Sequence, residues 1–246
     1  MNSSNNIEAK RKTLSLFNDI ITPAYDWSTE ESILDFSLSK GLNITSVAKE
    51  YKKIVSLALD ENQLLSATKY IGEENLSGSV SALLWNEDLK FDEQFDIATF
   101  IASIHHTNPS ESLAFASRNV KEGGKLLIFD GFFPMPVRES YTVLSKLADP
   151  TNRLHLTYEE VLDAVRGAGF DPLKIIPIRF KRSLEMTLNT YNSNDSIRSA
   201  VKELFLANET IFKQMHVTKE GDEWFYFYEL FVLLAEKRTP VIITQY

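Results

Sequence analysis

Short apolar runs alternate with segments of helical spacing through the middle of the chain. The runs at 95–101 and 125–129 are nearly continuous in apolar residues, which is typical of strands buried on both faces of a parallel sheet. Between them Asn108 can cap a helix with a proline in its first turn. Gly123 and Gly124 are expected to end that helix. The pattern therefore predicts a strand–helix–strand unit with parallel strands and a right-handed crossover.

Similar patterns recur on both sides of this unit. Thr157 and Glu160 form a capping-box pair at the start of a helix that reaches Ala168. One further helix is expected in the long connection 183–216, carrying apolar residues from Val201 to Ile211. Further strands are expected at 33–36, 54–59, 80–84, 174–181 and 223–236. The alternation of strands and helices predicts an α/β fold.

Composition narrows the class of protein. At 246 residues with 43% apolar residues, the chain is long enough for one large α/β domain. The absence of cysteine excludes disulfides and thiolate sites, and the net charge of -8 disfavours nucleic acid as a partner. No apolar run approaches the ~20 residues that span a bilayer, and the first twelve residues lack the apolar core of a signal peptide. A cytoplasmic protein that binds a small molecule and not a membrane is expected.

Several residues of the central unit form a recognisable set. Phe95 and Asp96 begin a strand, His105 and His106 follow it, a glycine pair precedes the next strand, and Asp130 ends that strand. This set resembles the class I S-adenosylmethionine (SAM) dependent methyltransferases of the small-molecule type, which include enzymes of ubiquinone and menaquinone biosynthesis. The resemblance implies a Rossmann-like, seven-stranded, mostly parallel sheet with an antiparallel last strand and helices on both faces.

The resemblance also implies a division of the chain. Residues 1–30 match a helical lid segment, and residues 31–238 match the methyltransferase-like domain, with an inserted helical region at 183–216. The tail 239–246 is rich in β-branched residues and can add a strand to a partner, as in a homodimer, or to the edge of its own sheet. In this family SAM is the cofactor. The positions expected to surround it are Tyr25, Asp35, Ser37, Ser39, Gly41, Asp60, Trp85, Asn86 and Phe100.

Three of the expected cofactor contacts depart from the family pattern. Ser37 and Ser39 replace two glycines of the turn after the first strand, where glycine allows close backbone approach. Ala58 stands where the family has an acidic residue for the ribose. Asp60 can substitute for it or can instead cap the next helix. Trp85 stands where an aspartate accepts from adenine, and its indole cannot accept.

The histidine pair supplies the candidate catalytic groups. His105 or His106 can act as a general base near neutral pH, or the pair can simply hold the turn. No third ligand lies near them in the sequence, so no metal is expected. The sequence thus predicts a SAM-dependent methyltransferase for a small-molecule acceptor. The alternative is a methyltransferase-fold protein that has lost SAM and serves another reaction or a non-catalytic binding role.

Overall fold

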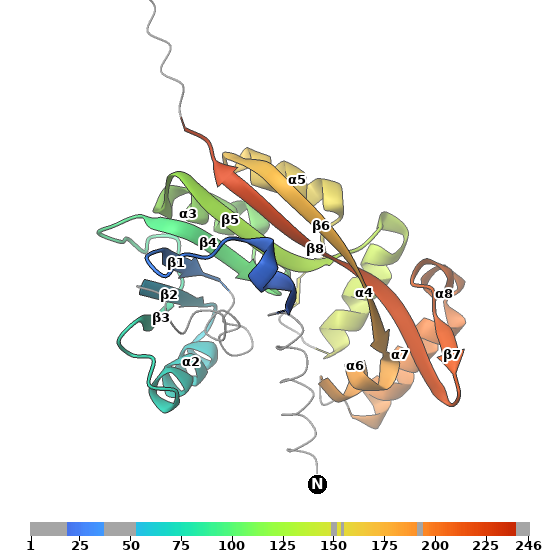
Figure 1. Ribbon diagram of the computed structural model, residues 1–246. Coiled ribbons are helices and arrows are strands. Elements are labelled where there is room, and N and C mark those ends of the chain that lie inside the picture. Colours follow the sequence, from blue (N-terminus) through green and yellow to red (C-terminus); the bar gives the residue numbers. More distant parts are fainter. Residues whose placement is uncertain (1–18, 37–52, 149–151, 154, 191–193, 240–246) are drawn as a thin grey trace, which may run out of the picture.

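The computed structural model describes residues 19–36, 53–148, 152, 153, 155–190 and 194–239. Within these residues eight strands form one sheet, and helices surround it (Figure 1). The strands are β1 (Ser32–Asp35), β2 (Lys53–Ala58), β3 (Val80–Leu84), β4 (Phe95–Ile101), β5 (Val120–Phe132), β6 (Phe170–Ser183), β7 (Thr218–Glu220) and β8 (Glu223–Lys237). The helices are η1 (Thr22–Ala24), α2 (Glu61–Glu73), η3 (Ile104–His106), α3 (Pro109–Asn119), α4 (Met135–Ala148), α5 (Tyr158–Gly167), α6 (Leu184–Thr190), α7 (Asp195–Ala207) and α8 (Glu209–Gln214).

The strand order is β3-β2-β1-β4-β5-β8-β6, with β7 paired to β8. The first five strands of this order are parallel, whereas β8 runs antiparallel to both of its neighbours. The predicted Rossmann-like fold with an antiparallel last strand is confirmed. The predicted number of seven strands is wrong, because Gly221, with a φ of 60°, turns the chain so that β7 pairs with the start of β8.

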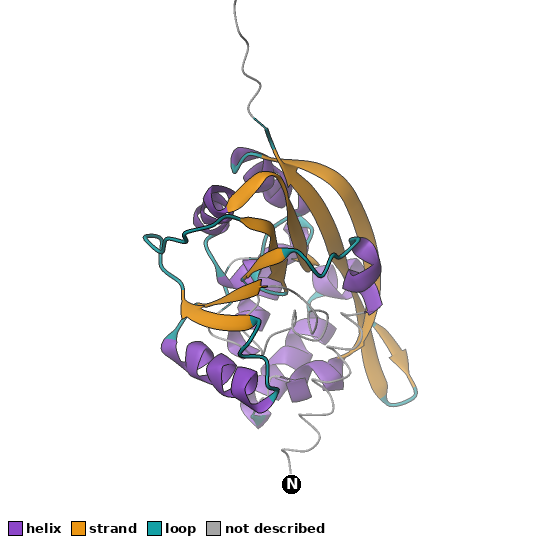
Figure 2. Ribbon diagram, turned by 60° about the vertical axis from the view of Figure 1, so that its left-hand side comes forward, coloured by secondary structure: helices purple, strands orange, loops and turns teal. Residues whose placement is uncertain are grey.

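Alternate side chains of the sheet enter two separate cores. Leu127 and Phe129 of β5 pack with buried residues of η1 and α2, while Leu126 and Ile128 pack with α3 and α5. Successive strand residues point to opposite faces, so a strand covered on both faces needs apolar residues at every position. Figure 2 shows the twisted sheet with helices around it. The near-continuous apolar runs of the sequence are explained by this double cover.

A third apolar cluster lies beyond the parallel strands. The long β6 and β8 ribbons extend past the rest of the sheet toward α6, α7 and α8 (Figure 1). Tyr226 of β8 is wholly buried there, against Phe205 of α7 and residues of α4 and α8. The prediction of a single helix in this region is wrong. Asn208 has an extended backbone and accepts a hydrogen bond from the Ile211 N–H, so it ends α7 and caps α8.

The helix of the central unit ends earlier than predicted. Asn108 caps α3 as expected, but α3 stops at Asn119 and β5 begins at Val120, before the glycine pair. Gly124 has a different reason to be glycine, because a Cβ there would lie 2.8 Å from the Asp96 carbonyl oxygen. The Thr157–Glu160 capping box is present at α5 as predicted. No helix within the described residues is long and apolar enough to cross a membrane.

Candidate active site

The candidate site lies where β4 and β5 end, at the edge of the sheet where open α/β folds bind ligands. β4 stops at Ile101, and the Ala102 N–H makes a final hydrogen bond of 2.7 Å to the Phe129 carbonyl on β5. Ala102 has a φ of 51°, a left-handed backbone that costs about 1–2 kcal/mol for a residue with a Cβ. This turn leads the chain into η3, which places His105 against the end of β5.

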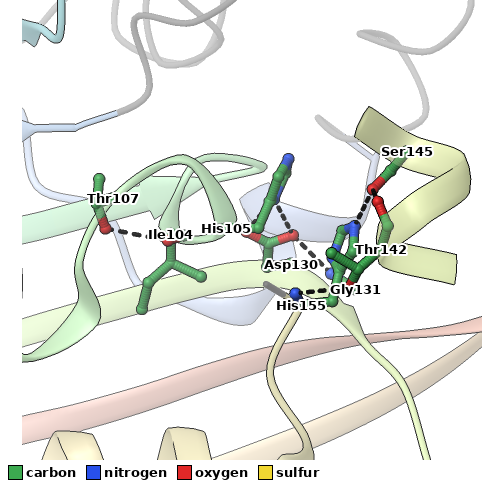
Figure 3. Close-up of polar contacts among 8 residues, drawn as sticks. All are labelled: Ile104, His105, Thr107, Asp130, Gly131, Thr142, Ser145 and His155. Carbon is green, nitrogen blue, oxygen red and sulfur yellow. Dashed lines mark hydrogen bonds and ion pairs between the residues drawn. The ribbon is translucent and has the colours of Figure 1, made fainter. Parts of the chain in front are cut away.

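His105 and Asp130 form the central contact of the site. His105 Nδ1 lies 2.8 Å from both carboxylate oxygens of Asp130, and the Gly131 N–H donates to the same carboxylate at 2.7 Å. Burial raises the pKa of Asp130, but the His105 imidazole and these hydrogen bonds lower it more, so the net pKa is below the ordinary value. An ionised Asp130 keeps the proton of neutral His105 on Nδ1. The Nε2 of His105 then carries a lone pair and points away from Asp130 (Figure 3).

A second histidine, His155, joins the site from the segment that follows α4. The centroid of its ring lies 5.2 Å from that of the His105 ring, with 29° between the ring planes, and its Nε2 lies 3.0 Å from the Ser145 hydroxyl of α4 (Figure 3). Burial, together with the neighbouring His105, lowers the pKa of His155 to about 3. His155 is therefore neutral at physiological pH. Nothing in the local pattern of the sequence marked it, although it is one of only four histidines in the chain.

Two aromatic rings complete this wall of the site. Phe133 and Tyr141 stack with a centroid separation of 3.8 Å. Both present edge contacts to the His155 ring, at 5.0 and 5.3 Å. Tyr141 of α4 thus packs beside His155. Phe133, Tyr141 and His155 are all buried, so the two aromatic rings fix the position of the imidazole.

The two predicted catalytic histidines occupy different environments. The His105 side chain is 15% exposed and pairs with Asp130. His106 is 4% exposed, and its ring packs 4.0 Å from that of His105. His105 therefore contacts a carboxylate and is still partly exposed, whereas His106 is enclosed by protein. A catalytic role for either histidine stays a prediction.

Two predicted cofactor contacts lie inside the protein. The Asp35 carboxylate accepts hydrogen bonds from the hydroxyls of Thr99, at 2.8 Å, and Ser56, at 3.0 Å, so it joins β1 to both neighbouring strands. Phe100 is wholly buried and stacks on Phe36 at 4.2 Å. Phe100 is a core residue because the two faces of β4 are both covered. These two side chains are buried between the strands and the covering helices, and they do not line an open surface.

Other predicted cofactor contacts retain free polar atoms. Asp60 caps α2 by accepting from the Gln63 N–H through Oδ1, yet the residue is exposed, so its second oxygen can still accept from a ligand hydroxyl. Trp85 packs edge-on against Phe115, and its buried Nε1–H has no hydrogen-bond partner within the described part of the chain. One acceptor and one donor thus remain near the ends of β2 and β3.

The remaining predicted cofactor contacts are less informative. Asn86 is exposed, and its side-chain oxygen accepts from the Asp88 N–H at 3.1 Å. Tyr25 donates to Glu31, and burial together with that carboxylate raises the pKa of its hydroxyl. Ser37, Ser39 and Gly41 lie outside the described residues. Among the residues that are described, no group of acidic and histidine side chains has the arrangement of a metal site.

Comparison with known proteins agrees with this geometry. Residues 34–128, which run from β1 into β5, match the family model of a methyltransferase domain. A solved structure of a protein from Bacillus halodurans, described as a candidate methyltransferase, superposes with a TM-score of 0.77 at 23% identity, covering 92% of this chain and 99% of that one. The chain has the class I methyltransferase fold. The resemblance predicted from the sequence is therefore confirmed.

Other solved structures share this fold at lower identity. The YcgJ protein from Bacillus subtilis superposes with a TM-score of 0.80 at 16% identity, over 92% of this chain and all of that one. The geranyl diphosphate C-methyltransferase from Streptomyces coelicolor, solved with Mg²⁺, geranyl diphosphate and S-adenosyl-L-homocysteine, superposes with a TM-score of 0.62 at 15% identity, over 92% of this chain and 78% of that one. No curated protein sequence matches the chain.

Proposed function

We propose that this protein is a SAM-dependent methyltransferase for a small-molecule acceptor, with His105 as its general base. The observation that carries the proposal is the His105–Asp130 pair at the ends of β4 and β5, in a chain whose residues 34–128 match the model of a methyltransferase domain. The crystallised relative with S-adenosyl-L-homocysteine supports SAM as the cofactor class. Its acceptor, geranyl diphosphate, supports a small molecule as the second substrate.

Three described side chains are proposed to hold the cofactor. The free oxygen of Asp60 can accept from a ribose hydroxyl, and the unpartnered Nε1–H of Trp85 can donate to a purine nitrogen. Tyr25, held by Glu31, is proposed to cover the bound molecule. When bound, SAM supplies an electrophilic methyl group. The exposed Asn86 and the turn that contains Ser37, Ser39 and Gly41 complete the proposed cofactor positions.

The chemistry of His105 follows from its hydrogen bonds. Its Nε2 lone pair would accept the proton from an O–H or N–H of the acceptor molecule. That oxygen or nitrogen could then take the methyl group that bound SAM would supply, with the methyl–sulfur bond broken and S-adenosylhomocysteine as the leaving group. The proton leaves the acceptor as an imidazolium N–H on His105. Asp130 stabilises this imidazolium, because an ionised carboxylate already faces Nδ1 at 2.8 Å. General-base catalysis of this kind typically contributes about 10²–10⁴-fold in rate.

The alternative function keeps the fold without SAM. Ser37 and Ser39 replace glycines, Ala58 is wholly buried where the family has an acid, and Trp85 replaces an acceptor. Isothermal titration calorimetry with SAM and with S-adenosylhomocysteine separates the two functions. Micromolar affinity for either molecule supports the methyltransferase and excludes the alternative, whereas millimolar or absent affinity rejects the methyltransferase.

A matched pair of variants tests the role of His105. His105→Asn should leave SAM affinity unchanged and lower formation of S-adenosylhomocysteine by about 10²-fold or more, since the base is lost. His216→Asn is the control, because His216 is an exposed histidine on the turn between α8 and β7 and has a φ of 46°, which asparagine tolerates. Equal activity of the two variants would show that His105 is not the base.

We also propose the setting in which the protein works. The net charge of -8 and the absence of cysteine support a cytoplasmic protein whose partners are small molecules and not nucleic acids. β6 is the last strand in the sheet order, so its outer edge can pair with a second copy in a homodimer. Sedimentation equilibrium measures the oligomeric state directly, and a mass of one chain at all concentrations would reject the homodimer.

A further inference from the structure

His155 is fixed in place by α4. Its backbone N–H donates to the Thr142 hydroxyl at 3.1 Å, and its Nε2 lies 3.0 Å from the Ser145 hydroxyl. Two residues earlier in the same segment, the Arg153 N–H donates to the His105 carbonyl at 2.9 Å. The segment therefore binds both α4 and η3, and it holds the His155 ring beside the His105 ring (Figure 3).

The hydrogen bonds of Ser145 decide which nitrogen of His155 carries the proton. The Ser145 hydroxyl donates its single proton to the Thr142 carbonyl at 3.0 Å, so toward His155 it acts as an acceptor. His155 Nε2 must then be the donor, and Nδ1 is left as a bare acceptor. Nδ1 is buried, and no hydrogen bond reaches it from any residue that the structure describes. The depressed pKa of His155 keeps this acceptor unprotonated at neutral pH.

A second acceptor in the same segment has the same property. The Asn152 side chain is 4% exposed, and its Nδ2 donates to the Ser145 carbonyl at 3.0 Å. That bond fixes the amide, yet its Oδ1 is buried and has no partner among the described residues. Ser145 thus orients two acceptor atoms, Nδ1 of His155 and Oδ1 of Asn152. Buried polar atoms are nearly always paired, so two such acceptors in one segment require a donor that the described part of the protein does not provide.

Building on the proposed methyl transfer, we propose that His155 and Asn152 accept hydrogen bonds from the methyl-acceptor molecule, which therefore carries O–H or N–H donors in addition to the atom that is methylated. The stacked Phe133 and Tyr141 rings that flank His155 are themselves buried, so they hold its imidazole in a fixed orientation. His155 is on this view a specificity residue, and His105 alone moves the proton. A molecule of the same shape without donors leaves the buried acceptors unpaired and binds less well.

The test is ¹⁵N NMR of the full-length protein labelled at its four histidines, because the ¹⁵N shift of an imidazole nitrogen reports its protonation and hydrogen bonding. Three probes of similar shape are titrated: catechol, 1,2-diaminobenzene and 1,2-dimethoxybenzene, of which the last has no donor. The expected result is a bare-acceptor Nδ1 signal for His155 in the free protein that moves with catechol or with the diamine and not with the dimethoxy compound. If catechol moves the Nδ1 signal more than the diamine does, the methyl-acceptor molecule donates through hydroxyl groups. If the diamine moves it more, the molecule donates through amine groups.

Two variants complete the design. His155→Phe keeps the aromatic packing and removes the acceptor, so the donor probes should bind about 2- to 10-fold more weakly, as expected for one hydrogen bond. Ser145→Ala removes the hydrogen bond between the Ser145 hydroxyl and His155 Nε2 and should weaken the preference for the Nε2–H form of His155. This variant replaces His155→Phe in the test if His155→Phe does not fold. The proposal is overturned if Nδ1 of His155 is already hydrogen-bonded in the free protein. It is also overturned if no donor-selective shift appears, or if the affinity for the probes is unchanged in His155→Phe. The probe titrations are run without SAM, so their outcome does not depend on SAM binding. A failure of SAM to bind would overturn the proposed function alone.

Discussion

Replacement of Asp130 by asparagine is the sharpest test of how the site works. Asp130 is 4% exposed and faces His105 Nδ1 with both carboxylate oxygens at 2.8 Å. The Asp130→Asn variant would keep the size of the side chain but not the charge that stabilises an imidazolium. The new amide N–H₂ can also donate to Nδ1, which would move the histidine proton to Nε2 and block the lone pair that accepts the substrate proton.

The structure sets the size of the expected loss. A hydrogen bond to a charged group contributes about 1.5–3 kcal/mol, which corresponds to about 10- to 150-fold in rate when the bond forms fully only in the transition state. The wrong tautomer adds to this, and in serine proteases the equivalent change costs about 10⁴-fold. We therefore expect Asp130→Asn to lower kcat by at least about 10²-fold, with little change in SAM affinity.

The assay combines formation of S-adenosylhomocysteine with ¹⁵N NMR of the histidines. The variant must first show the far-ultraviolet circular dichroism of the wild type, so that unfolding is excluded. The NMR spectrum should then show the His105 proton on Nε2 in the variant and on Nδ1 in the wild type. A folded Asp130→Asn protein that keeps its activity within about threefold would refute the proposed pairing, since a lost charge-assisted bond should cost more.

Other predictions concern stability. The pKa of His155 is about 3 in the folded protein and near 6.5 when unfolded, so the unfolded chain binds more protons between these values, and stability should fall as pH drops from about 6.5. His155→Phe should flatten the pH dependence of Tm between about pH 6.5 and 4, and an unchanged slope would contradict this burial. Gly124→Ala should lower the free energy of unfolding by about 1–3 kcal/mol in urea titrations, because its Cβ would meet backbone oxygen at 2.8 Å, whereas Gly78→Ala, with no atom within 4 Å, is the matched control. Thr157→Ala removes the α5 cap and should cost about 1 kcal/mol in the same urea assay; no measurable change would show that the cap contributes nothing.

The sequence by itself determined the central strands of the sheet and the starts of two of its helices. The continuous apolar runs at 95–101 and 125–129 lie in strands whose two faces are both covered. A strand of this kind needs apolar residues at successive positions, so its sequence shows the run directly. Asn108 and Thr157 mark helix starts because a cap is satisfied by backbone groups two or three residues away. Features of this kind depend on neighbours in the chain, so they can be predicted from the chain alone.

Tertiary structure decided everything that depends on distant residues. Gly124 is required by the Asp96 carbonyl on the neighbouring strand and not by the helix before it. The site unites His105, Asp130 and His155 only because Ala102 turns sharply after β4 and α4 returns the later segment to the ends of the strands. A separation of 25 residues, as between His105 and Asp130, carries no periodic signal. Side chains so far apart in sequence meet only through the topology of the sheet. His105 was visible in the sequence because it belongs to the set of residues that carries the family resemblance, and His155 is not in that set.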